Sequence, residues 1–453
     1  MSTTAPGNAE PQLGAQTPHA KLGLGVPSVP PGYKQTEVGV IPEEWEASLL
    51  DSIAKRGSGH TPDKKQPEYW NGQIKWISLA DSPALDQVHI ADTYASVTPA
   101  GIANSSAVVH PAGTVVLSRD AGVGKSAIMK TDMAVSQHFM AWRCGPKLDN
   151  FFLYYWLQSA KPEFERIANG STILTIGLPY FRELKIPHPP LPEQRAIATA
   201  LSDVDALLAA LDRLIAKQRD LKQAAMQQLL TGQTRLPGFT GKWETKRLGE
   251  VGAFLKGSGV KKDESQRGPL PCIRYGEIYT RHNDCIKEFH SFISPQVAAT
   301  ACLLRKGDLL FAGSGETKEE IGKCVAFVDD FDAYAGGDIV ILRPQGVDSL
   351  FLGYSLNTPS ISRQKASRGQ GDAVVHIGSS ALASITLALP PLPEQTAIAT
   401  VLSDMDLELA ALEQRRDKTR ALKQGMMQEL LTGRTRLRPG NAEPQLGASM
   451  KSK

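Results

Sequence analysis

Two stretches of the chain carry apolar residues at alternating steps of about three and four. In the first stretch they are Ile197, Leu201, Val204, Leu208, Leu211 and Ile215, and in the second Ile398, Leu402, Met405, Leu409 and Leu412. Such a heptad seam predicts long helices that bury one stripe against another helix. Pro192 and Pro393 suit helix starts, and Gly232 and Gly433 suit helix ends. Each predicted helix therefore has about 38 residues.

The two predicted helices are copies of each other. Residues 190–236 and 391–437 are identical at 31 of 47 positions, at an offset of 201. Both begin with Pro-Leu-Pro-Glu-Gln and end with Leu-Leu-Thr-Gly-x-Thr-Arg-Leu, so the chain is a tandem duplication. A helix of roughly 57 Å cannot bury its stripe alone. We expect the two helices to pack antiparallel about a pseudo-twofold axis; packing of each helix on its own domain is the alternative.

The segments between the helices diverge and contain shorter periodic runs. In residues 45–189 the pattern predicts strands at 74–78, 107–109 and 114–118 and a helix at 149–168, whose Phe151, Phe152, Tyr155 and Trp156 we expect in the core. In residues 243–389 it predicts strands at 272–275, 308–311 and 339–342 and a helix at 350–357. Weak matches, such as Gly57-Ser58-Gly59 with Gly257-Ser258-Gly259, relate the two segments.

These patterns predict an α+β fold, in which two mixed α/β domains are separated by two long antiparallel helices that form a coiled-coil-like, pseudo-twofold pair. The expected segments are a flexible N-terminal arm (1–31), a first domain (32–189), a first helical region (190–234), a second domain (235–390), a second helical region (391–437) and a flexible tail (438–453). The sequence Pro-Gly-Asn-Ala-Glu-Pro-Gln-Leu-Gly-Ala occurs at both 6–15 and 439–448, a duplicate that an added linker would also explain.

Composition excludes several classes of protein. The net charge, 50 − 47 = +3, gives no overall signal for nucleic acid, so a DNA-binding protein would need locally concentrated cations. The longest apolar run, Phe151–Leu157, is too short to span a membrane. Five scattered cysteines without a CxxC pair predict reduced thiols and a cytoplasmic protein. The histidines form no HxxxH or HExxH pattern, so we expect no metal site.

Basic residues cluster at corresponding places in the two copies. Residues 55–75 hold five Lys and Arg against two acids, and residues 256–281 hold six against three. These cations are mixed with Gly, Ser, His and Tyr, which suits loops that contact phosphates and base edges. A solvated basic surface is the alternative interpretation of either cluster.

Two stretches imitate catalytic motifs. Residues 121–126, Ala-Gly-Val-Gly-Lys-Ser, resemble a phosphate loop, but Arg119 stands where its first glycine is required. We expect instead a hairpin loop that offers Arg119 and Lys125 to DNA. Residues 311–315, Phe-Ala-Gly-Ser-Gly, fit an adenine methyltransferase motif, but the Asp/Asn-Pro-Pro-Tyr/Phe partner motif of such enzymes is missing. The sequence thus predicts no catalytic site.

Over residues 32–437 the chain resembles the specificity subunit of type I restriction–modification enzymes. The resemblance is carried by the duplicated helical segments, by Arg235–Phe239 and by the start at Ile41–Trp45. The resemblance implies that each variable segment is a target recognition domain for one half of a split, asymmetric double-stranded DNA sequence. It implies that the helices set the spacing and dock two methyltransferase subunits, joined by two restriction (translocase) subunits. The chain itself would be non-catalytic and bind no cofactor, whereas its partners would use S-adenosylmethionine, ATP and Mg.

We select the candidate DNA-binding residues by their position in the basic loops or in motifs that resemble those of the family. In the first copy they are Lys55, Arg56, Ser58, His60, Thr61, Lys64, Lys75, Ser78, Arg119, Lys125, Gln137, His138, Ser171 and Thr172. In the second copy they are Lys256, Ser258, Lys261, Lys262, Arg274, Tyr275, Arg281, Ser314, Thr317, Lys318, Asp338 and His376. Arg119, Gln137, Arg274 and Arg281 are the candidates for base edges, because they present a fork or an amide.

A structural adaptor whose paired helices join partner subunits, without reading DNA sequence, is the alternative function. Binding to selected versus random DNA would distinguish the two.

Overall fold

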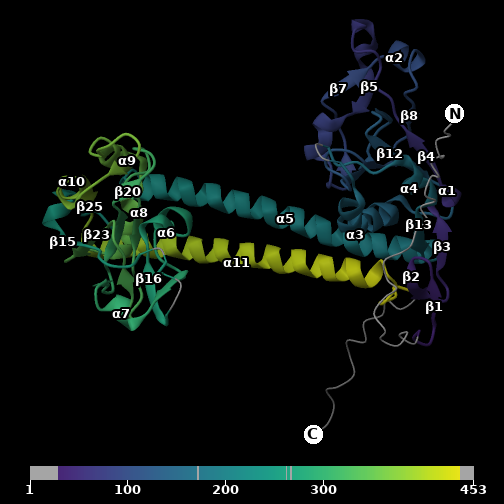
Figure 1. Ribbon diagram of the computed structural model, residues 1–453. Coiled ribbons are helices and arrows are strands. Elements are labelled where there is room, and N and C mark those ends of the chain that lie inside the picture. The colour runs from purple at the N-terminus through teal and green to yellow at the C-terminus, as the bar shows by residue number, and fades with distance from the viewer. Residues whose placement is uncertain (1–28, 171–172, 262, 266–267, 439–453) are drawn as a thin grey trace, which may run out of the picture. The chain divides into compact units, whose positions relative to one another are not determined.

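The computed structural model describes residues 29–170, 173–261, 263–265 and 268–438 (Figure 1). Its residue contacts separate the chain into two units. Unit 1 contains the residues up to Asp205 together with those from Ala421 onward, and unit 2 contains Ala206–Arg420. Because both boundaries fall inside a long helix, each unit combines one variable segment with parts of both long helices.

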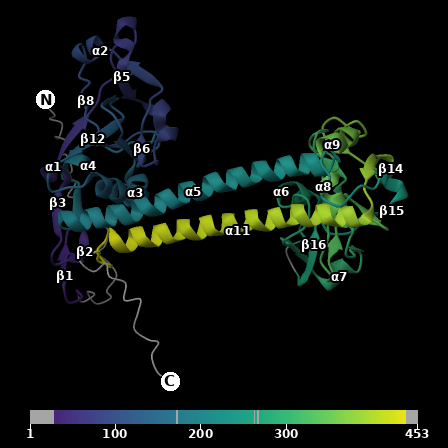
Figure 2. The same cartoon turned by 180° about the vertical axis from the view of Figure 1, so that it is seen from behind.

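The two predicted long helices are confirmed as α5 (Leu191–Leu229) and α11 (Leu392–Leu430), of 39 residues each. Just beyond them, Gly232 and Gly433 have φ of 69° and 75°, a left-handed conformation that glycine adopts without steric cost and that ends helices. In unit 2 the helices lie side by side (Figure 2), and Asp212 pairs with Arg416 while Lys222 pairs with Asp406. Residue numbers rise along one helix as they fall along the other, so the pair is antiparallel.

Unit 1 contains two main sheets. The first has the order β4 (Ala54–Ser58), β12 (Phe139–Cys144), β9 (Val115–Ser118), β10 (Ser126–Met129) and β6 (His89–Ile90). The second has the order β7 (Ala95–Val97), β5 (Trp70–Ile77), β11 (Met133–Val135) and β8 (Val109–His110). Two small pairs accompany them, β1 (Tyr33–Thr36) with β2 (Gly39–Pro42) and β3 (Glu46–Leu49) with β13 (Lys185–His188).

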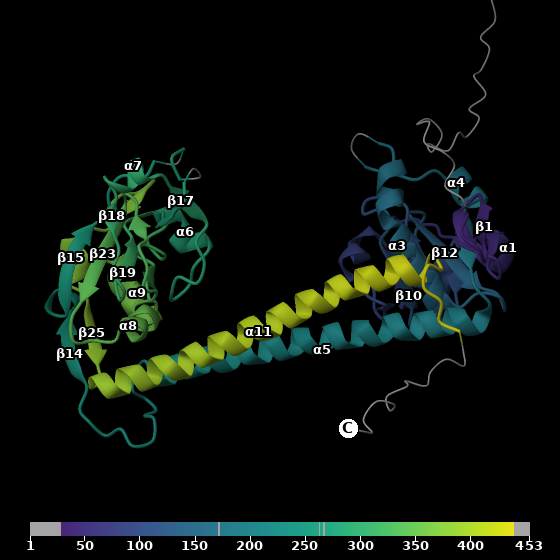
Figure 3. The same cartoon turned by 90° about the horizontal axis from the view of Figure 1, so that it is seen from below.

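Unit 2 repeats most of this plan, with four strands instead of five in its first sheet among the described residues (Figure 3). Its first sheet has the order β15 (Gly252–Lys256), β23 (Ile339–Pro344), β19 (Leu309–Ala312) and β21 (Cys324–Ala326). Its second has the order β17 (Ser291–Ile293), β16 (Leu270–Ile273), β22 (Tyr334–Ala335) and β18 (Cys302–Leu303). The small pairs are β14 (Glu244–Arg247) with β25 (Thr386–Leu389) and β20 (Ser314–Gly315) with β24 (Val375–His376).

Short helices complete both units. Unit 1 has α1 (Leu50–Ile53), α2 (Pro99–Ala103), α3 (Asn150–Ile167), α4 (Leu178–Glu183) and two 3₁₀ turns at Pro67–Tyr69 and Leu79–Ala84. Unit 2 has α6 (Tyr275–Thr280), α7 (Pro295–Ala298), α8 (Ser349–Ser355), α9 (Pro359–Ala366), α10 (Ser379–Ala383) and a 3₁₀ turn at Leu248–Glu250. On α3, Phe152 and Tyr155 are fully buried, as expected, whereas Phe151 and Trp156 are half-buried.

The sequence-based prediction of a strand at 272–275 is wrong at its end. Strand β16 stops at Ile273, and Tyr275 already begins α6. The carboxylate of Glu277 accepts a hydrogen bond from the backbone N–H of Arg274 at 2.9 Å, which fixes the start of this helix. The run 107–109 is likewise displaced, because the strand that forms there is β8 at Val109–His110.

One glycine in each unit permits a close approach between the two main sheets. A Cβ atom on Gly59 would lie 1.5 Å from the carbonyl oxygen of Val135, and one on Gly257 would lie 2.0 Å from that of Gly336. Both glycines follow the edge strand of the first sheet directly. The strand registers thus make Gly59 equivalent to Gly257, two residues away from the match that the Gly-Ser-Gly motif suggested.

The same clasp joins the helix ends to the domain in both units. In unit 1, Arg436 donates two hydrogen bonds to the buried carboxylate of Glu193, at 2.7 Å each, and lies over the ring of Trp45. In unit 2, Arg235 forms the same pair with the buried Glu394 and lies over the ring of Trp243. Because such forked pairs demand a fixed geometry, they orient each domain on its helix ends.

A second recurring contact involves a lysine, an aspartate and a tyrosine. In unit 1, Lys423 pairs with Asp205 at 2.6 Å, and the hydroxyl of Tyr155 donates to the same carboxylate at 2.9 Å. In unit 2, Lys222, Asp406 and Tyr354 repeat the arrangement at 2.7 Å and 2.7 Å. Unit 2 adds a third charge, because Lys222 also lies 3.3 Å from the buried Asp284.

The heptad residues differ in their surroundings along each helix. Ile197 and Leu201 lie in the main core of unit 1, together with Leu430 and Leu431. The corresponding residues in the core of unit 2 are Ile398, Leu402, Leu229 and Leu230. Leu211, Ile215 and Leu409 are also buried, whereas Val204, Leu208, Met405 and Leu412 are half-buried. The domains thus bury the ends of the seam, and Leu211, Ile215 and Leu409 are buried nearer the middle of the helices.

Candidate nucleic-acid interface

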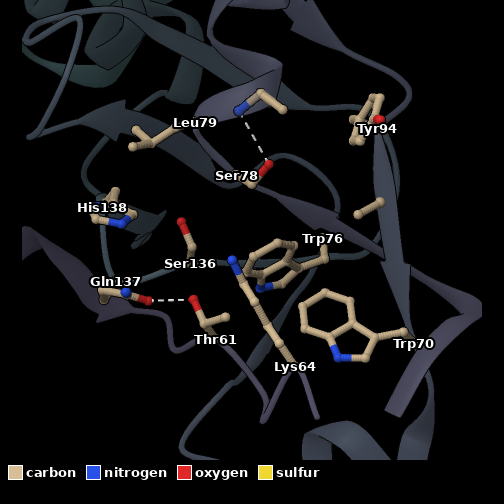
Figure 4. Close-up of a pocket in the computed structure, with 12 residues that line it drawn as sticks. Thr61, Lys64, Trp70, Trp76, Ser78, Leu79, Tyr94, Ser136, Gln137 and His138 are labelled. Carbon is tan, nitrogen blue, oxygen red and sulfur yellow. Dashed lines mark hydrogen bonds between the residues drawn. The ribbon is translucent and has the colours of Figure 1, made fainter. Parts of the chain in front are cut away.

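A cleft of about 600 Å³ opens beside the second sheet of unit 1 (Figure 4). The chain segments around β4, β5, β7 and β11 bring together residues that are far apart in the sequence. Five of the predicted DNA-binding residues line it: Thr61, Lys64, Ser78, Gln137 and His138. Its other walls are Trp70, Trp76, Leu79, Ala80, Tyr94, Ala95 and Ser136.

The polar rim of this cleft is held in place by hydrogen bonds. The hydroxyl of Thr61 donates to Oε1 of Gln137 at 2.6 Å, so the exposed amide keeps its two Nε2 hydrogens available for other acceptors. Ser78 caps the 3₁₀ turn that follows it and also bonds to Asp81. The rim therefore combines a fixed amide donor with the exposed ammonium of Lys64.

The hairpin predicted around Arg119 and Lys125 exists as the connection between the antiparallel strands β9 and β10. Both side chains are half-buried, and each lies near an oxygen atom of the same unit. The Nε atom of Arg119 lies 3.5 Å from Asp120, and Nζ of Lys125 donates to the carbonyl of Ser82 at 3.3 Å. Asp120 also binds His138 at 2.7 Å. A hairpin here, in place of a strand–loop–helix, gives residues 121–126 no phosphate-loop geometry.

The remaining candidates of unit 1 differ in their freedom to meet a ligand. Lys55 and His60 are exposed. Arg56 pairs with Asp51 at 3.0 Å, Ser58 donates to the carbonyl of Phe139, and Lys75 donates to the carbonyl of Ala91 and lies near Asp92. Ser171 and Thr172 lie outside the described residues.

Unit 2 has a different cleft, of about 470 Å³, at the edge of its first sheet. Four predicted residues line it: Lys256, Ser314, Asp338 and His376. The hydroxyl of Ser314 lies 2.9 Å from Nδ1 of His376, across the β20–β24 pair. Asp338 is exposed at the lip with a φ of 59°. Aspartate adopts this left-handed conformation more readily than most non-glycine residues.

The other candidates of unit 2 lie outside this cleft. Lys261, Tyr275, Arg281, Thr317 and Lys318 are exposed. Two candidates have partners within the unit: Ser258 donates to the carbonyl of Thr300 at 2.8 Å, and Arg274 donates to the hydroxyl of Ser265 at 3.1 Å. Lys262 lies outside the described residues.

Sequence reasoning missed the aromatic wall of the unit 1 cleft. Trp70 and Trp76 pack edge to face at 5.1 Å, and Tyr94 is 85% exposed. The pairing of β5 with β7 creates this wall, and no short motif encodes that pairing. A tyrosine between polar residues, as in Asp-Thr-Tyr-Ala-Ser, was the one available signal.

The described residues contain no group of three His, Cys, Asp or Glu side chains that could hold a metal ion. Burial raises the pKa of the Cys144, Cys272 and Cys324 thiols to about 12. Thiols of such high pKa are poor nucleophiles at neutral pH. Among the helices of the described part, none is long and apolar enough to cross a membrane.

Comparison with known proteins gives one consistent result. The model of the type I restriction modification DNA specificity domain matches residues 42–218 and 240–420. Two specificity subunits of type I restriction enzymes from Methanocaldococcus jannaschii are similar to the chain. MjaIX is 26% identical over 64% of this chain and 70% of its own length, and MjaVIII is 23% identical over 88% and 94%.

The fold has a counterpart of known structure. The crystal structure of the specificity (S) subunit of a type I restriction–modification system from M. genitalium has a TM-score of 0.53 and 17% identity, covering 85% of this chain and 96% of that one. Two family matches, one over most of each variable segment and the following helix, account for the duplication and for the α+β architecture. The chain therefore belongs to the type I restriction–modification DNA specificity family, whose members recognise DNA sequence.

Proposed function

We propose that this chain recognises a bipartite, asymmetric double-stranded DNA sequence and directs associated methyltransferase and restriction subunits to it. The observation that carries the proposal is the contrast between the two units. They share strand order and helix clasps, yet their clefts have different residues and different positions in the fold. Two domains that share a framework but have different clefts are suited to recognising two different half-sites.

The charged residues divide the contacts by type. Exposed cations such as Lys55, Lys64, Lys256 and Lys261 are suited to phosphates, which fix position on the duplex without reading sequence. Gln137 in unit 1 and Asp338 in unit 2, at the lips of the two clefts, are suited to base edges, because they offer a donor and an acceptor in a fixed position.

The long helices supply a surface for the partners. On α5, Leu207, Leu214 and Leu221 are spaced by seven residues and are 40–49% exposed, outside the buried seam. A row of half-exposed leucines on a polar helix is typical of a protein–protein contact. We propose that one methyltransferase subunit docks on this row. From the duplication of the helical segments we infer that a second docks along α11, although the row is not repeated there: its counterparts are Glu408, Arg415 and Leu422. Two restriction subunits join them.

The chain itself has no catalytic role in this proposal. Adenine methylation, translocation and cleavage belong to the partners, with S-adenosylmethionine, ATP and Mg as their cofactors, in the cytoplasm. The test is the sequencing of methylated adenines in cells that carry the complete system. One split motif, lost when this chain is deleted, is the expected result. Methylation without any sequence preference would leave only an adaptor role and overturn the proposal.

A further inference from the structure

One buried polar group in the unit 1 cleft makes no hydrogen bond within the described part of the fold. The side chain of Ser136 is 1% exposed, and its hydroxyl has no hydrogen-bond partner among the described residues. Figure 4 shows this hydroxyl directed into the space next to Ser78, Trp76 and His138. A buried hydroxyl left without a partner destabilises the fold. The unmet bond indicates a ligand that completes it.

The walls of the cleft are suited to a flat ring. The indole N–H groups of Trp70 and Trp76 donate to the carbonyls of Asp63 and His60, so these rings have only carbon edges and faces left for a ligand. Tyr94 stands at the lip, 85% exposed, which is unusual for so large an aromatic side chain. Aromatic side chains of this kind stabilise nucleobases that stack on them.

Resting on the proposed DNA recognition, we propose that the unit 1 cleft receives one nucleobase displaced from the stack of the bound duplex. Its ring packs against Tyr94 and the tryptophan wall, and its polar edge bonds to the hydroxyl of Ser136 and to Nε2 of Gln137. Lys64, at the rim, neutralises a phosphate of the displaced nucleotide. Stacking on the wall and the completed hydrogen bonds offset the cost of unstacking the base.

Other occupants fit less well. A phosphate alone would leave the aromatic wall unused. A base edge read inside the intact stack would meet the exposed rim at Gln137 but not the buried Ser136. The unit 2 cleft has no comparable aromatic wall among the described residues. Its lining includes Gly313, Gly378 and Ser379, and Phe254 supplies its one phenyl ring. The displaced base is therefore confined to the half-site read by unit 1.

The test uses the whole chain assembled with its methyltransferase subunits and a duplex that carries the methylated motif. The probe duplexes each contain one abasic site, placed in turn opposite every base of the motif. Removing the partner base lowers the cost of displacement. The methylated adenines are left out of the comparison, because the methyltransferase subunits flip these bases themselves. At one other position of the unit 1 half-site we expect binding to tighten about tenfold, and 2-aminopurine placed there to brighten on binding.

The variants separate the cleft from the rest of the interface. Tyr94→Ala and Ser136→Ala should abolish the tightening, whereas Tyr94→Phe, which keeps the ring, should retain it. Apart from the methylated adenine, no position in the unit 2 half-site should tighten. The inference is overturned if no position other than the methylated adenines tightens, or if the tightening survives both alanine variants; motif-specific binding would then persist and the proposed function would stand. Failure of the proposed function would look different, because the assembly would prefer no duplex over random DNA.

Discussion

The two units agree where residues from both copies meet and differ where DNA is proposed to bind. The arginine–glutamate clasp and the lysine–aspartate–tyrosine contact recur in both, each joining a residue of one helical copy to a residue of the other. A change on one side would leave a buried charge on the other without a partner, which is costly. The clefts bear no such mutual constraint. The comparison teaches that contacts shared between copies resist divergence, whereas surfaces used by one copy alone are free to diverge.

The comparison also exposes one asymmetry inside the shared framework. In unit 2, Lys222 lies between two carboxylates, Asp406 and Asp284, whereas in unit 1 its counterpart Lys423 pairs with Asp205. Burial raises the pKa of the Asp284 carboxyl, against the lowering effect of Lys222. The pKa of Lys222 is itself raised, since the two aspartates outweigh its desolvation. The stability of unit 2 therefore depends on Lys222 more strongly than the stability of unit 1 depends on Lys423.

The largest effect is expected from removing these lysines. Lys222→Met should leave the buried carboxylate of Asp284 facing the half-buried carboxylate of Asp406 and destabilise unit 2 by about 3 kcal/mol. The matched Lys423→Met should cost unit 1 about 1–2 kcal/mol, since Asp205 keeps the hydroxyl of Tyr155. Hydrogen exchange of peptides from each unit, followed by mass spectrometry, measures the two effects separately. Equal losses in both units would contradict the role given to Asp284.

The pH dependence of Lys222→Met gives an independent check. Without the lysine, the folded-state pKa of Asp284 rises further above its unfolded value. The folded state then binds a proton more readily than the unfolded state, so stability increases as the pH falls through the folded-state pKa. We expect the deficit of this variant to shrink from pH 8 to about pH 5. Adding Asp284→Asn should remove most of the pH dependence, and a deficit that grows on acidification would refute the explanation.

A smaller effect is expected at the two arginine clasps, where it is unit 1 that holds the additional charged partner. Glu394→Gln takes the carboxylate away from Arg235, whereas after Glu193→Gln Arg436 still has Glu44 at 2.8 Å. We expect the unfolding midpoint of unit 2 to fall by about 2–4 °C in the first variant, and that of unit 1 by less in the second. Proteolysis of each variant during a temperature ramp shows which unit opens first. A larger loss in unit 1 would be the contrary result.

The smallest effects concern single exposed cations at the two clefts. Lys64→Gln in unit 1 and Lys256→Gln in unit 2 should each weaken binding to cognate and random duplexes alike. Each should also reduce the slope of log affinity against log salt by about one. Fluorescence anisotropy between 50 and 200 mM salt measures this slope. A loss confined to the cognate duplex would mean that the lysine reads a base and not a phosphate.

Much of the framework could be predicted from the sequence, because it is encoded locally. The heptad seam, the prolines near the helix starts and the glycines Gly232 and Gly433 defined both long helices, and near-identity of the copies revealed the duplication. The strand order and the clefts could not be predicted, since they depend on pairings between distant segments. Trp76 and Ser136 meet only because β5 pairs with β11. Arg119 was predicted to offer its guanidinium group to DNA, but the carboxylate of its neighbour Asp120 lies 3.5 Å from its Nε atom.

The central claim, that each unit reads its own half of the DNA sequence, is tested most directly by exchanging one domain. Residues 45–189 are replaced by the matching segment of a relative with a different motif, and the methylated adenines of cells carrying the hybrid system are sequenced. The account predicts a new motif in which one half and the spacer are unchanged and the other half is that of the relative. A hybrid that is active but changes both halves would contradict it.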